Sequence, residues 1–228
     1  MPQGLHVVVT GATGMVGGRV LELALERPDV RAVTAVGRRP SGRSHAKLRE
    51  VTHADFDDCA ALAPALSDVD VVLYGIGVYT GAQPDAEFRR VTVDQTLAFA
   101  RALRTASPRA AFGLLSGQGA DRTESSRVAF KRYKGMAENG LARLGFERLW
   151  FFRPGYIHPS TPRREPNLFY VALRLVYPPA RLVVPTIGIE SDELARAMLR
   201  VALDGAAGGS GPAIEHRDLI RLGRSATV

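Results

Sequence analysis

A glycine-rich segment near the N-terminus has the residue types and the spacing to bind a pyrophosphate. It follows an apolar run at 5–9 and comprises Gly11, Ala12, Thr13, Gly14, Met15, Val16 and Gly17. A strand, a glycine turn and a helix start together present free backbone N–H groups and a helix N-terminus to phosphate oxygens. The spacing G-x-x-G-x-x-G differs from the common G-x-G-x-x-G, but the strand–turn–helix context favours phosphate binding over a purely structural turn.

The residues after the second expected strand, at 31–36, favour NADP(H) over NAD(H). This position contacts the adenine ribose in dinucleotide-binding folds, and an acidic residue there would repel a 2′-phosphate. The chain instead has Arg38 and Arg39. Because guanidinium groups match a phosphate in shape and charge, we expect Arg38 to be the main determinant and Arg39 a secondary one. The alternative is that both are surface residues of an arginine-rich protein.

Two further strand ends supply candidate cofactor contacts. Asp55 and Phe56 follow the expected third strand, where a carboxylate can accept a hydrogen bond from the adenine amino group and an apolar side chain can flank its ring. Asp55 is equally suited to cap a helix. After the expected fourth strand, small residues would let the backbone lie along the cofactor. These residues are Gly75, Ile76 and Gly77.

Apolar strand-like runs alternate with helical patterns along the chain. This alternation predicts an α/β fold, a Rossmann-type doubly wound parallel sheet with helices on both faces. The expected strands are 7–10, 31–36, 48–52, 69–74, 110–116, 147–153 and 213–215. The expected helices are 15–26, 57–66 with Asp57 as its cap, 85–105, 125–144, 168–176, 192–203 and 217–222.

We expect a single domain over 1–228, in which residues 154–228 form a small substrate-side region. Prolines break the first part of this region into short pieces, and the Ala/Gly tract at 206–212 is typical of a flexible loop. Ligands of such folds bind at the carboxyl ends of the strands, so this region is suited to build a substrate pocket.

Composition argues against several other classes of protein. The chain has 228 residues, and no apolar run approaches the roughly 20 residues that a membrane helix needs. The net charge is +7, but arginine carries nearly all of it without a basic stripe interleaved with aromatics, which argues against nucleic acid as a partner. A single cysteine, Cys59, excludes an internal disulfide framework, and the histidines show no metal-ligand spacing. With no visible signal peptide, these features predict a cytoplasmic protein without a metal or a membrane partner.

These motifs together resemble those of the short-chain dehydrogenase/reductase superfamily, and more closely its small atypical members, the NmrA-like and TIP30-like NAD(P)-binding proteins. The resemblance covers nearly the whole chain. The segments that carry it are Thr10–Gly17, Val36–Arg39, His53–Phe56, Tyr74–Gly77, Leu114–Ala120, Lys134–Glu138 and Phe152–Ile157. The last segment corresponds to the nicotinamide-side loop of the family, which implies cofactor contacts from Pro154, Gly155, Tyr156 and Ile157.

The resemblance also implies a catalytic Ser, Tyr and Lys, and the tyrosine is missing. In the superfamily the tyrosine donates a proton to a carbonyl, the lysine lowers the tyrosine pKa and holds the nicotinamide ribose, and the serine polarises the carbonyl oxygen. Ser116 matches the serine and Lys134 the lysine, but the position four before Lys134 is Phe130. The other candidate hydroxyls are those of Tyr79, Tyr133 and Tyr156, and none is assigned a role. Glu138 is interpreted as an ordinary helix-face carboxylate.

Two functions are consistent with these residues. The first is an NADP(H)-dependent oxidoreductase of a small organic acceptor such as a quinone, a flavin or an activated alkene, because the cofactor itself carries the hydride chemistry. The second is a non-catalytic NADP(H)-sensing regulatory protein of the NmrA-like type, favoured by the loss of the tyrosine beside a retained phosphate turn. A nucleotide-sugar epimerase or dehydratase fits less well, since the region after Arg153 is short and such chemistry usually needs the tyrosine. The residues identify neither the substrate nor the oligomeric state.

Overall fold

A seven-stranded parallel sheet forms the centre of the structure, a computed structural model that describes residues 4–78, 83–161, 168–205 and 211–225. The strands lie in the order β3-β2-β1-β4-β5-β6-β9, and every neighbouring pair is parallel. They are β1 (Leu5–Thr10), β2 (Val30–Gly37), β3 (Leu48–Thr52), β4 (Val71–Tyr74), β5 (Ala111–Leu115), β6 (Leu149–Arg153) and β9 (Ala213–Glu215). The predicted Rossmann-type α/β fold is confirmed.

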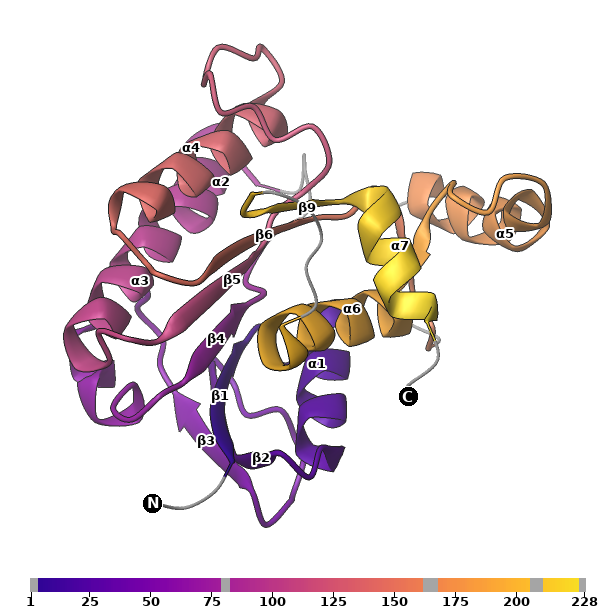
Figure 1. Cartoon of the computed structure of the whole chain (residues 1–228). Helices are drawn as coiled ribbons and strands as arrows, with labels where there is room; N and C mark the ends of the chain where they lie inside the picture. The colour runs from indigo at the N-terminus through magenta and orange to yellow at the C-terminus, as the bar shows by residue number, and fades with distance from the viewer. Residues whose placement is uncertain (1–3, 79–82, 162–167, 206–210, 226–228) are drawn as a thin grey trace.

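Helices cover both faces of this sheet (Figure 1). On one face lie α1 (Met15–Glu26), α6 (Ser191–Asp204) and α7 (His216–Arg224). On the other lie α2 (Asp85–Arg89), α3 (Gln95–Ala106) and α4 (Ala129–Arg143), together with the 3₁₀ helix η1 (Ala60–Ala65) and the π-helical turn η2 (Arg90–Asp94). The central strands are therefore buried on both faces, which explains why Val7, Val8 and Val9 are all fully buried.

The strand order places a crevice between β1 and β4. From β1 the chain moves outward to β2 and β3, and then returns to form β4 on the other side of β1. The loops that leave β1 and β4 therefore diverge, one toward α1 and the other toward α2, and open a space above the carboxyl ends of the strands.

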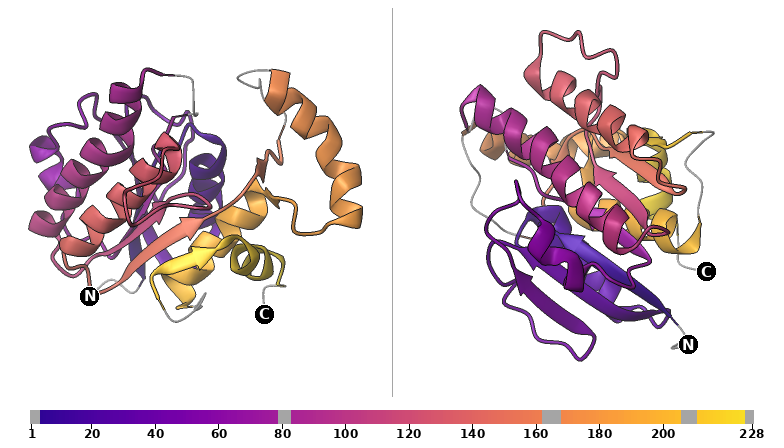
Figure 2. Two further views of the ribbon diagram at one scale, coloured as in Figure 1. Left: turned by 90° about the horizontal axis from the view of Figure 1, so that it is seen from above. Right: turned by 90° about the vertical axis from the view of Figure 1, so that its left-hand side faces the viewer.

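The C-terminal region adds a two-stranded sheet and a projecting helix. β7 (Ile157–His158) pairs in parallel with β8 (Ile189–Glu190), and α5 (Leu168–Val183) extends from the body of the molecule (Figure 2). The sequence predicts the helix only to residue 176, whereas the structure continues it through Pro178 and Pro179. An ion pair of 2.6 Å between Arg181 and Glu193 joins the end of α5 to α6.

Other expected helices also differ from the structure. Asp57 does not cap a helix, because η1 begins at Ala60 with Cys59 as its N-cap and the Asp57 carboxylate pairs with Arg90. The helix expected at 85–105 is three consecutive segments, α2, η2 and α3. α4 begins four residues later than expected, because the Asp121 carboxylate accepts hydrogen bonds from backbone N–H groups at 123, 125 and 126 and holds them in a turn. Residues 206–210 of the expected loop and Tyr79 lie outside the described residues.

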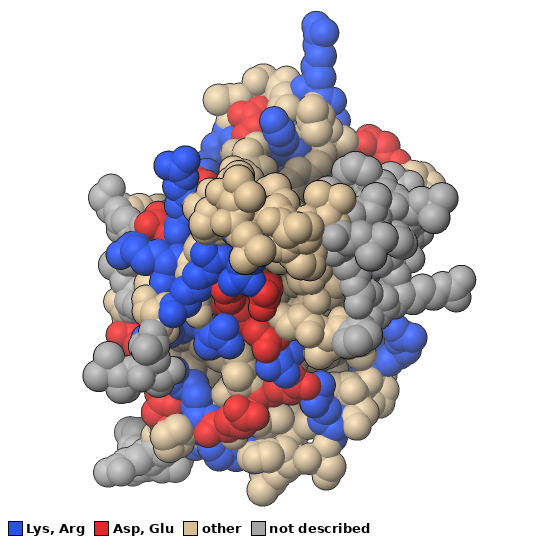
Figure 3. Space-filling model, turned by 90° about the vertical axis from the view of Figure 1, so that its right-hand side faces the viewer, with Lys and Arg blue, Asp and Glu red and all other residues tan. Residues whose placement is uncertain are grey.

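Acidic and basic side chains are interspersed on the face that Figure 3 shows. Among the described residues many arginines form ion pairs, including Arg19 with Asp192 and Arg27 with Asp29, each at 2.7 Å. The positive charge on this face is therefore divided among acidic neighbours and does not form one basic patch.

Gly17→Ala should lower the free energy of unfolding by about 1–3 kcal/mol, although alanine is the better helix former. A Cβ atom at position 17 would lie 2.3 Å from the Gly11 carbonyl oxygen and 2.9 Å from that of Thr10. Urea unfolding measures the change. Gly211→Ala is the control, because a Cβ atom at that position meets nothing within 4 Å. Equal stability of the two variants would contradict the close packing described for Gly17.

Candidate functional site

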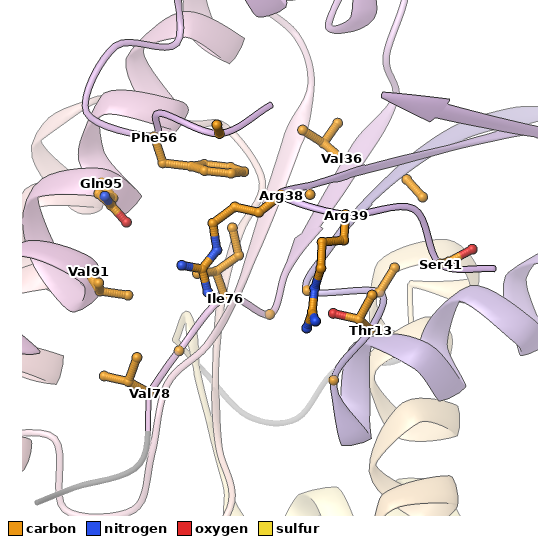
Figure 4. Close-up of a pocket in the computed structure, with 18 of the residues that line it drawn as sticks. Thr13, Val36, Arg38, Arg39, Ser41, Phe56, Ile76, Val78, Val91 and Gln95 are labelled. Atoms are coloured by element: carbon orange, nitrogen blue, oxygen red, sulfur yellow. The ribbon is translucent and has the colours of Figure 1, made fainter. Parts of the chain in front are cut away.

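A pocket of about 300 Å³ lies at the carboxyl ends of β1, β2 and β4, where the strand order reverses (Figure 4). It brings together candidate residues from four separate loops. The predicted cofactor residues that line it are Gly11, Ala12, Thr13, Gly14, Arg38, Arg39, Asp55, Phe56, Gly75, Ile76 and Gly77.

The glycine turn after β1 forms the floor of the pocket. Gly11 has φ of +70°, a left-handed conformation that favours glycine, and a Cβ atom on it would lie 2.6 Å from the Gly75 carbonyl oxygen. The Gly14 N–H donates a hydrogen bond of 2.8 Å to the Gly11 carbonyl, which closes the turn. Gly14 is the N-cap of α1 and no side chain caps the helix. The first N–H groups of α1 therefore have no side-chain acceptor at the helix start, which is the condition for an anion to bind there.

The second half of the predicted phosphate segment lies beneath the pocket and does not line it. Val16 is buried in the core between the sheet and α6, and Met15 packs against the same core. Gly17 contacts the Gly11 carbonyl. These three residues fix the turn in place, while Gly11 to Gly14 form its exposed surface.

Arg38 and Arg39 extend from the end of β2 into the pocket (Figure 4). Both side chains are exposed, and neither forms a hydrogen bond or an ion pair with another residue in the described part of the chain. Nearby arginines differ: Arg43 pairs with Glu22, and Arg90 pairs with Glu87. The pocket therefore holds two guanidinium groups whose donors are available to a ligand.

The side chain of Phe56 forms part of the wall beside Arg38 (Figure 4). It is almost fully buried and its ring packs edge-on against His53 at 5.3 Å between ring centroids. Asp55 also lines the pocket, and its carboxylate accepts a hydrogen bond of 3.0 Å from the Asp57 N–H. Asp55 thus stabilises its own loop and does not cap η1.

The opposite wall comes from Gln83 and from the helical segment α2–η2–α3, whose part in the pocket the sequence analysis missed. The residues of that helical segment that line the pocket are Glu87, Arg90, Val91 and Gln95. The hydrogen bond from Arg90 is the main cause of a lowered Glu87 pKa, and the charge of Arg38 acts in the same direction. The available signal was that the expected helix at 85–105 is the next element after the strand that ends at Tyr74, since the helix that follows a parallel strand starts near the carboxyl edge of the sheet.

Ser116, Lys134 and Phe130 gather at the carboxyl end of β5, outside the pocket wall. The Lys134 ammonium donates a hydrogen bond of 2.9 Å to the Leu115 carbonyl oxygen. Burial lowers the pKa of Lys134 to about 8, while the charge of Glu138 acts in the opposite direction. The Phe130 ring packs over Gly117, where an added Cβ atom would lie 2.3 Å from the ring. Phe130 thus occupies the tyrosine position without a polar atom.

The Ser116 hydroxyl donates a hydrogen bond of 2.6 Å to the Glu138 carboxylate. The Glu138 side chain is fully buried and forms an ion pair with Arg153. Arg153 also forms an ion pair with Glu215, at 2.8 Å between nitrogen and oxygen. This chain of contacts joins the ends of β5, β6 and β9 to α4. The interpretation of Glu138 as an ordinary helix-face carboxylate is therefore wrong. Its spacing of four from Lys134 places both on one helix face and was the signal to notice.

The described tyrosines near this cluster have other contacts. Tyr133 is buried on the α2 side of α4. Its hydroxyl donates a hydrogen bond of 2.5 Å to the Asp85 carboxylate, and its ring packs edge-on against Phe88. The ring of Tyr156 packs against Tyr177 at 5.6 Å between centroids, at the base of α5. The hydroxyl of Tyr133 is thus already bonded on a different face from that of Lys134.

The loop at Pro154, Gly155, Tyr156 and Ile157 borders the Ser116 cluster and not the pocket. The Pro154 carbonyl accepts a hydrogen bond of 2.8 Å from the Gln118 N–H, and the Gly155 N–H donates a hydrogen bond of 3.0 Å to the His216 ring. Ile157 belongs to β7. The candidate residues therefore form two groups on one sheet edge, a pocket at β1, β2 and β4 and a polar cluster at β5 and β6.

The chain belongs to the NAD(P)H-binding family, whose model matches residues 11–143. A curated relative is the protein Fmp52, mitochondrial, of Aspergillus fumigatus, 33% identical over 177 residues that cover 75% of this chain and 74% of that protein.

Two solved structures have a similar fold. One is a short chain dehydrogenase from Burkholderia cenocepacia J2315 in complex with NADP, with a TM-score of 0.67, 21% identity and coverage of 96% of this chain and 92% of that chain. The other is the Bordetella bronchiseptica enzyme WbmH in complex with NAD+, with a TM-score of 0.66, 18% identity and coverage of 95% and 79%. The fold implied by the resemblance to short-chain dehydrogenases/reductases is confirmed, and the two neighbours differ in cofactor.

The relatives' names correct one prediction. Several carry the word mitochondrial, which overturns the predicted cytoplasmic location. That prediction depended on the lack of a visible signal peptide and of a disulfide framework, and neither feature distinguishes these compartments. Among the described residues, no helix is both long and apolar enough to cross a membrane.

Glu138→Ala should lower the free energy of unfolding by about 3–5 kcal/mol, because it removes the main partner of the largely buried Arg153 guanidinium. Thermal or urea unfolding measures this. The control is Asp218→Ala, which breaks an exposed ion pair with Arg221 and should change stability by about 1 kcal/mol or less. A loss as small as that of the control would show that Glu138 is not an energetic link between the strand ends.

Proposed function

We propose that the protein is an NADP(H)-dependent oxidoreductase of a small organic acceptor. The observation that supports this most strongly is the pair Arg38 and Arg39 at the end of β2, whose guanidinium groups enter the pocket without partners among the described residues. A 2′-phosphate on the adenine ribose is the ligand that such groups at this strand end suit best. NAD(H) would leave both charges unpaired.

The rest of the pocket fits the other parts of a dinucleotide. The glycine turn and the open N-terminus of α1 suit a pyrophosphate. Phe56 and the carboxylate of Asp55 suit the face and the amino group of an adenine ring. The small residues Gly75 and Gly77 leave the backbone of the β4 end accessible. When bound, reduced NADP would supply a hydride, and Lys134 and the loop at 154–157 lie along the same sheet edge, where the nicotinamide half would extend.

The β5 cluster favours acceptors that need no activated carbonyl. Phe130 has no proton to donate, and the Ser116 proton is bonded to Glu138. Neither residue can polarise a ketone oxygen in this arrangement. We therefore infer a quinone, a flavin or an activated alkene as the acceptor class, since the electron demand of these molecules draws the hydride without strong electrophilic assistance.

The same cluster favours a second candidate, a non-catalytic NADP(H) sensor. A sensor keeps the cofactor pocket and has no need of an acid, which matches Phe130 beside an intact glycine turn. The two candidates differ in turnover: a reductase oxidises NADPH faster when an acceptor such as 9,10-phenanthrenequinone is present, whereas a sensor binds NADPH equally well and shows only background oxidation.

Arg38→Ala should weaken NADPH binding about tenfold or more, because charge-assisted hydrogen bonds to a phosphate contribute about 1.5–3 kcal/mol. It should leave the affinity for NADH unchanged. Titration of the purified protein with each nucleotide, followed by nicotinamide fluorescence, measures both values.

The matched control is Arg49→Ala, which removes an exposed arginine of β3 that does not line the pocket. Its NADPH affinity should equal that of the wild type. Binding of neither nucleotide by the wild type would refute both candidate functions, and equal weakening of NADPH and NADH in Arg38→Ala would refute the assignment of NADP(H).

A further inference from the structure

The amide side chain of Gln95 lines the pocket without a hydrogen-bond partner. Gln95 is the first residue of α3 and directly follows the π-helical turn η2, a kind of turn that is frequent at functional sites. The residue is only 9% exposed, yet neither its amide oxygen nor its amide nitrogen is bonded to any residue that the structure describes. Because a polar group that is buried without a partner costs free energy, this amide points to a ligand that supplies the partner.

The polar neighbours of Gln95 on the same helical segment are already paired. Glu87 and Arg90, which also line the pocket, form an ion pair of 2.8 Å with each other. Thr96, the next residue in the chain, donates a hydrogen bond of 2.9 Å to the Thr92 carbonyl. Among the described polar side chains that this segment contributes to the pocket, Gln95 is therefore the one whose hydrogen-bonding groups are available.

The Gln95 amide faces an apolar part of the pocket (Figure 4). It lies between Phe56 and Val91, with Ile76 across from it in this view, and all four residues line the pocket. Phe99, one turn further along α3, stacks against the Phe56 ring with 6.2 Å between the ring centroids and fixes that wall. The surroundings of the amide therefore suit a flat, largely apolar group that has a polar edge.

A primary amide matches a ligand edge that offers a donor and an acceptor side by side, because its oxygen accepts and its NH₂ group donates. Adenine has such an edge, where the 6-amino group lies next to the ring nitrogens N1 and N7, and glutamine amides pair with adenine through two hydrogen bonds. Phosphate oxygens, in contrast, are acceptors only and would leave the amide oxygen unpaired.

Asp55 complements Gln95 on the same wall of the pocket. It precedes Phe56 in the chain, and one of its carboxylate oxygens accepts a hydrogen bond of 3.0 Å from the Asp57 N–H. The other oxygen has no hydrogen-bond partner in the described part of the chain. An ionised carboxylate only accepts hydrogen bonds, so this oxygen suits the second N–H of an amino group and disfavours a base with a carbonyl at that position.

We propose that Gln95 recognises the 6-amino edge of the adenine base and thereby determines the base specificity of the pocket. The inference rests on the proposed function, since it takes the adenosine half of NADP(H) as the occupant. In this arrangement the amide oxygen of Gln95 accepts a hydrogen bond from the amino group, and the amide nitrogen donates one to the adjacent ring nitrogen. Gln95 acts by binding alone, and its role is separate from that of Arg38 at the 2′-phosphate.

The test compares calorimetric titrations with 2′,5′-ADP and with the analogue that carries unsubstituted purine in place of adenine. The wild type should bind 2′,5′-ADP about tenfold more tightly than the analogue, because the analogue lacks the amino group that Gln95 and Asp55 recognise. Gln95→Met keeps nearly the same length without an amide. In this variant 2′,5′-ADP should bind about tenfold more weakly than to the wild type, and the ratio between the two fragments should shrink to about threefold.

Gln95→Glu is a second variant with a different expected result. Its carboxylate can accept a hydrogen bond from the amino group but cannot donate one to the ring nitrogen. Both fragments should therefore bind more weakly, while the ratio between them stays near that of the wild type. The matched control is Gln118→Met, which replaces an exposed glutamine that does not line the pocket and should bind both fragments as the wild type does.

Urea unfolding of the free protein separates recognition from a structural role. Gln95→Met should be at least as stable as the wild type, because it removes a buried amide that has no partner. A loss of stability together with an unchanged ratio between the fragments would overturn the role of Gln95 and leave the proposed function intact. Failure of the wild type to bind 2′,5′-ADP would overturn both.

Discussion

Direct backbone contact among three glycines is the constraint on which the pocket depends. Side chains would force the β1–α1 turn, the first turn of α1 and the end of β4 apart, since Cβ atoms at Gly11 and Gly17 would overlap the carbonyl oxygens of Gly75 and Gly11. The Thr10 hydroxyl accepts a hydrogen bond of 3.0 Å from the Gly75 N–H across the same junction. With the three segments in contact, the helix N-terminus opens onto the crevice between β1 and β4, and the ends of β2 and β3 supply its outer wall.

Electrostatics divides the carboxyl edge of the sheet into two halves. Around β1, β2 and β4, the guanidinium groups of Arg38 and Arg39 have no hydrogen-bond or ion-pair partner among the described residues, and no side chain caps the start of α1. Around β5 and β6, in contrast, the charges of Glu138, Arg153 and Glu215 satisfy one another. The first half has the character of a binding site. In the second half the Phe130 side chain has no polar atom, the Ser116 hydroxyl is bonded to Glu138 and the Lys134 ammonium is bonded to the Leu115 carbonyl.

Local patterns were sufficient to predict most of the fold. The bounds of α1, β3 and β9 match the expected ranges. The pocket residues at the ends of β1 to β4 were also predictable, since parallel strands bring their carboxyl ends together. Three other features were not predictable from local patterns. The burial of Glu138 depends on Arg153 of β6, and the late start of α4 depends on the Asp121 turn. The strands β7 and β8 have only two residues each, too few to form a recognisable pattern.

We propose above that the pocket selects a 2′-phosphate through Arg38 and Arg39. Calorimetric titration with 2′,5′-ADP and with ADP tests it most directly, because the first fragment carries this phosphate and neither contains the nicotinamide. We predict that 2′,5′-ADP binds about tenfold or more tightly than ADP, with the difference set by charge-assisted hydrogen bonds to Arg38 and Arg39. Equal affinities, or a preference for ADP, would contradict it.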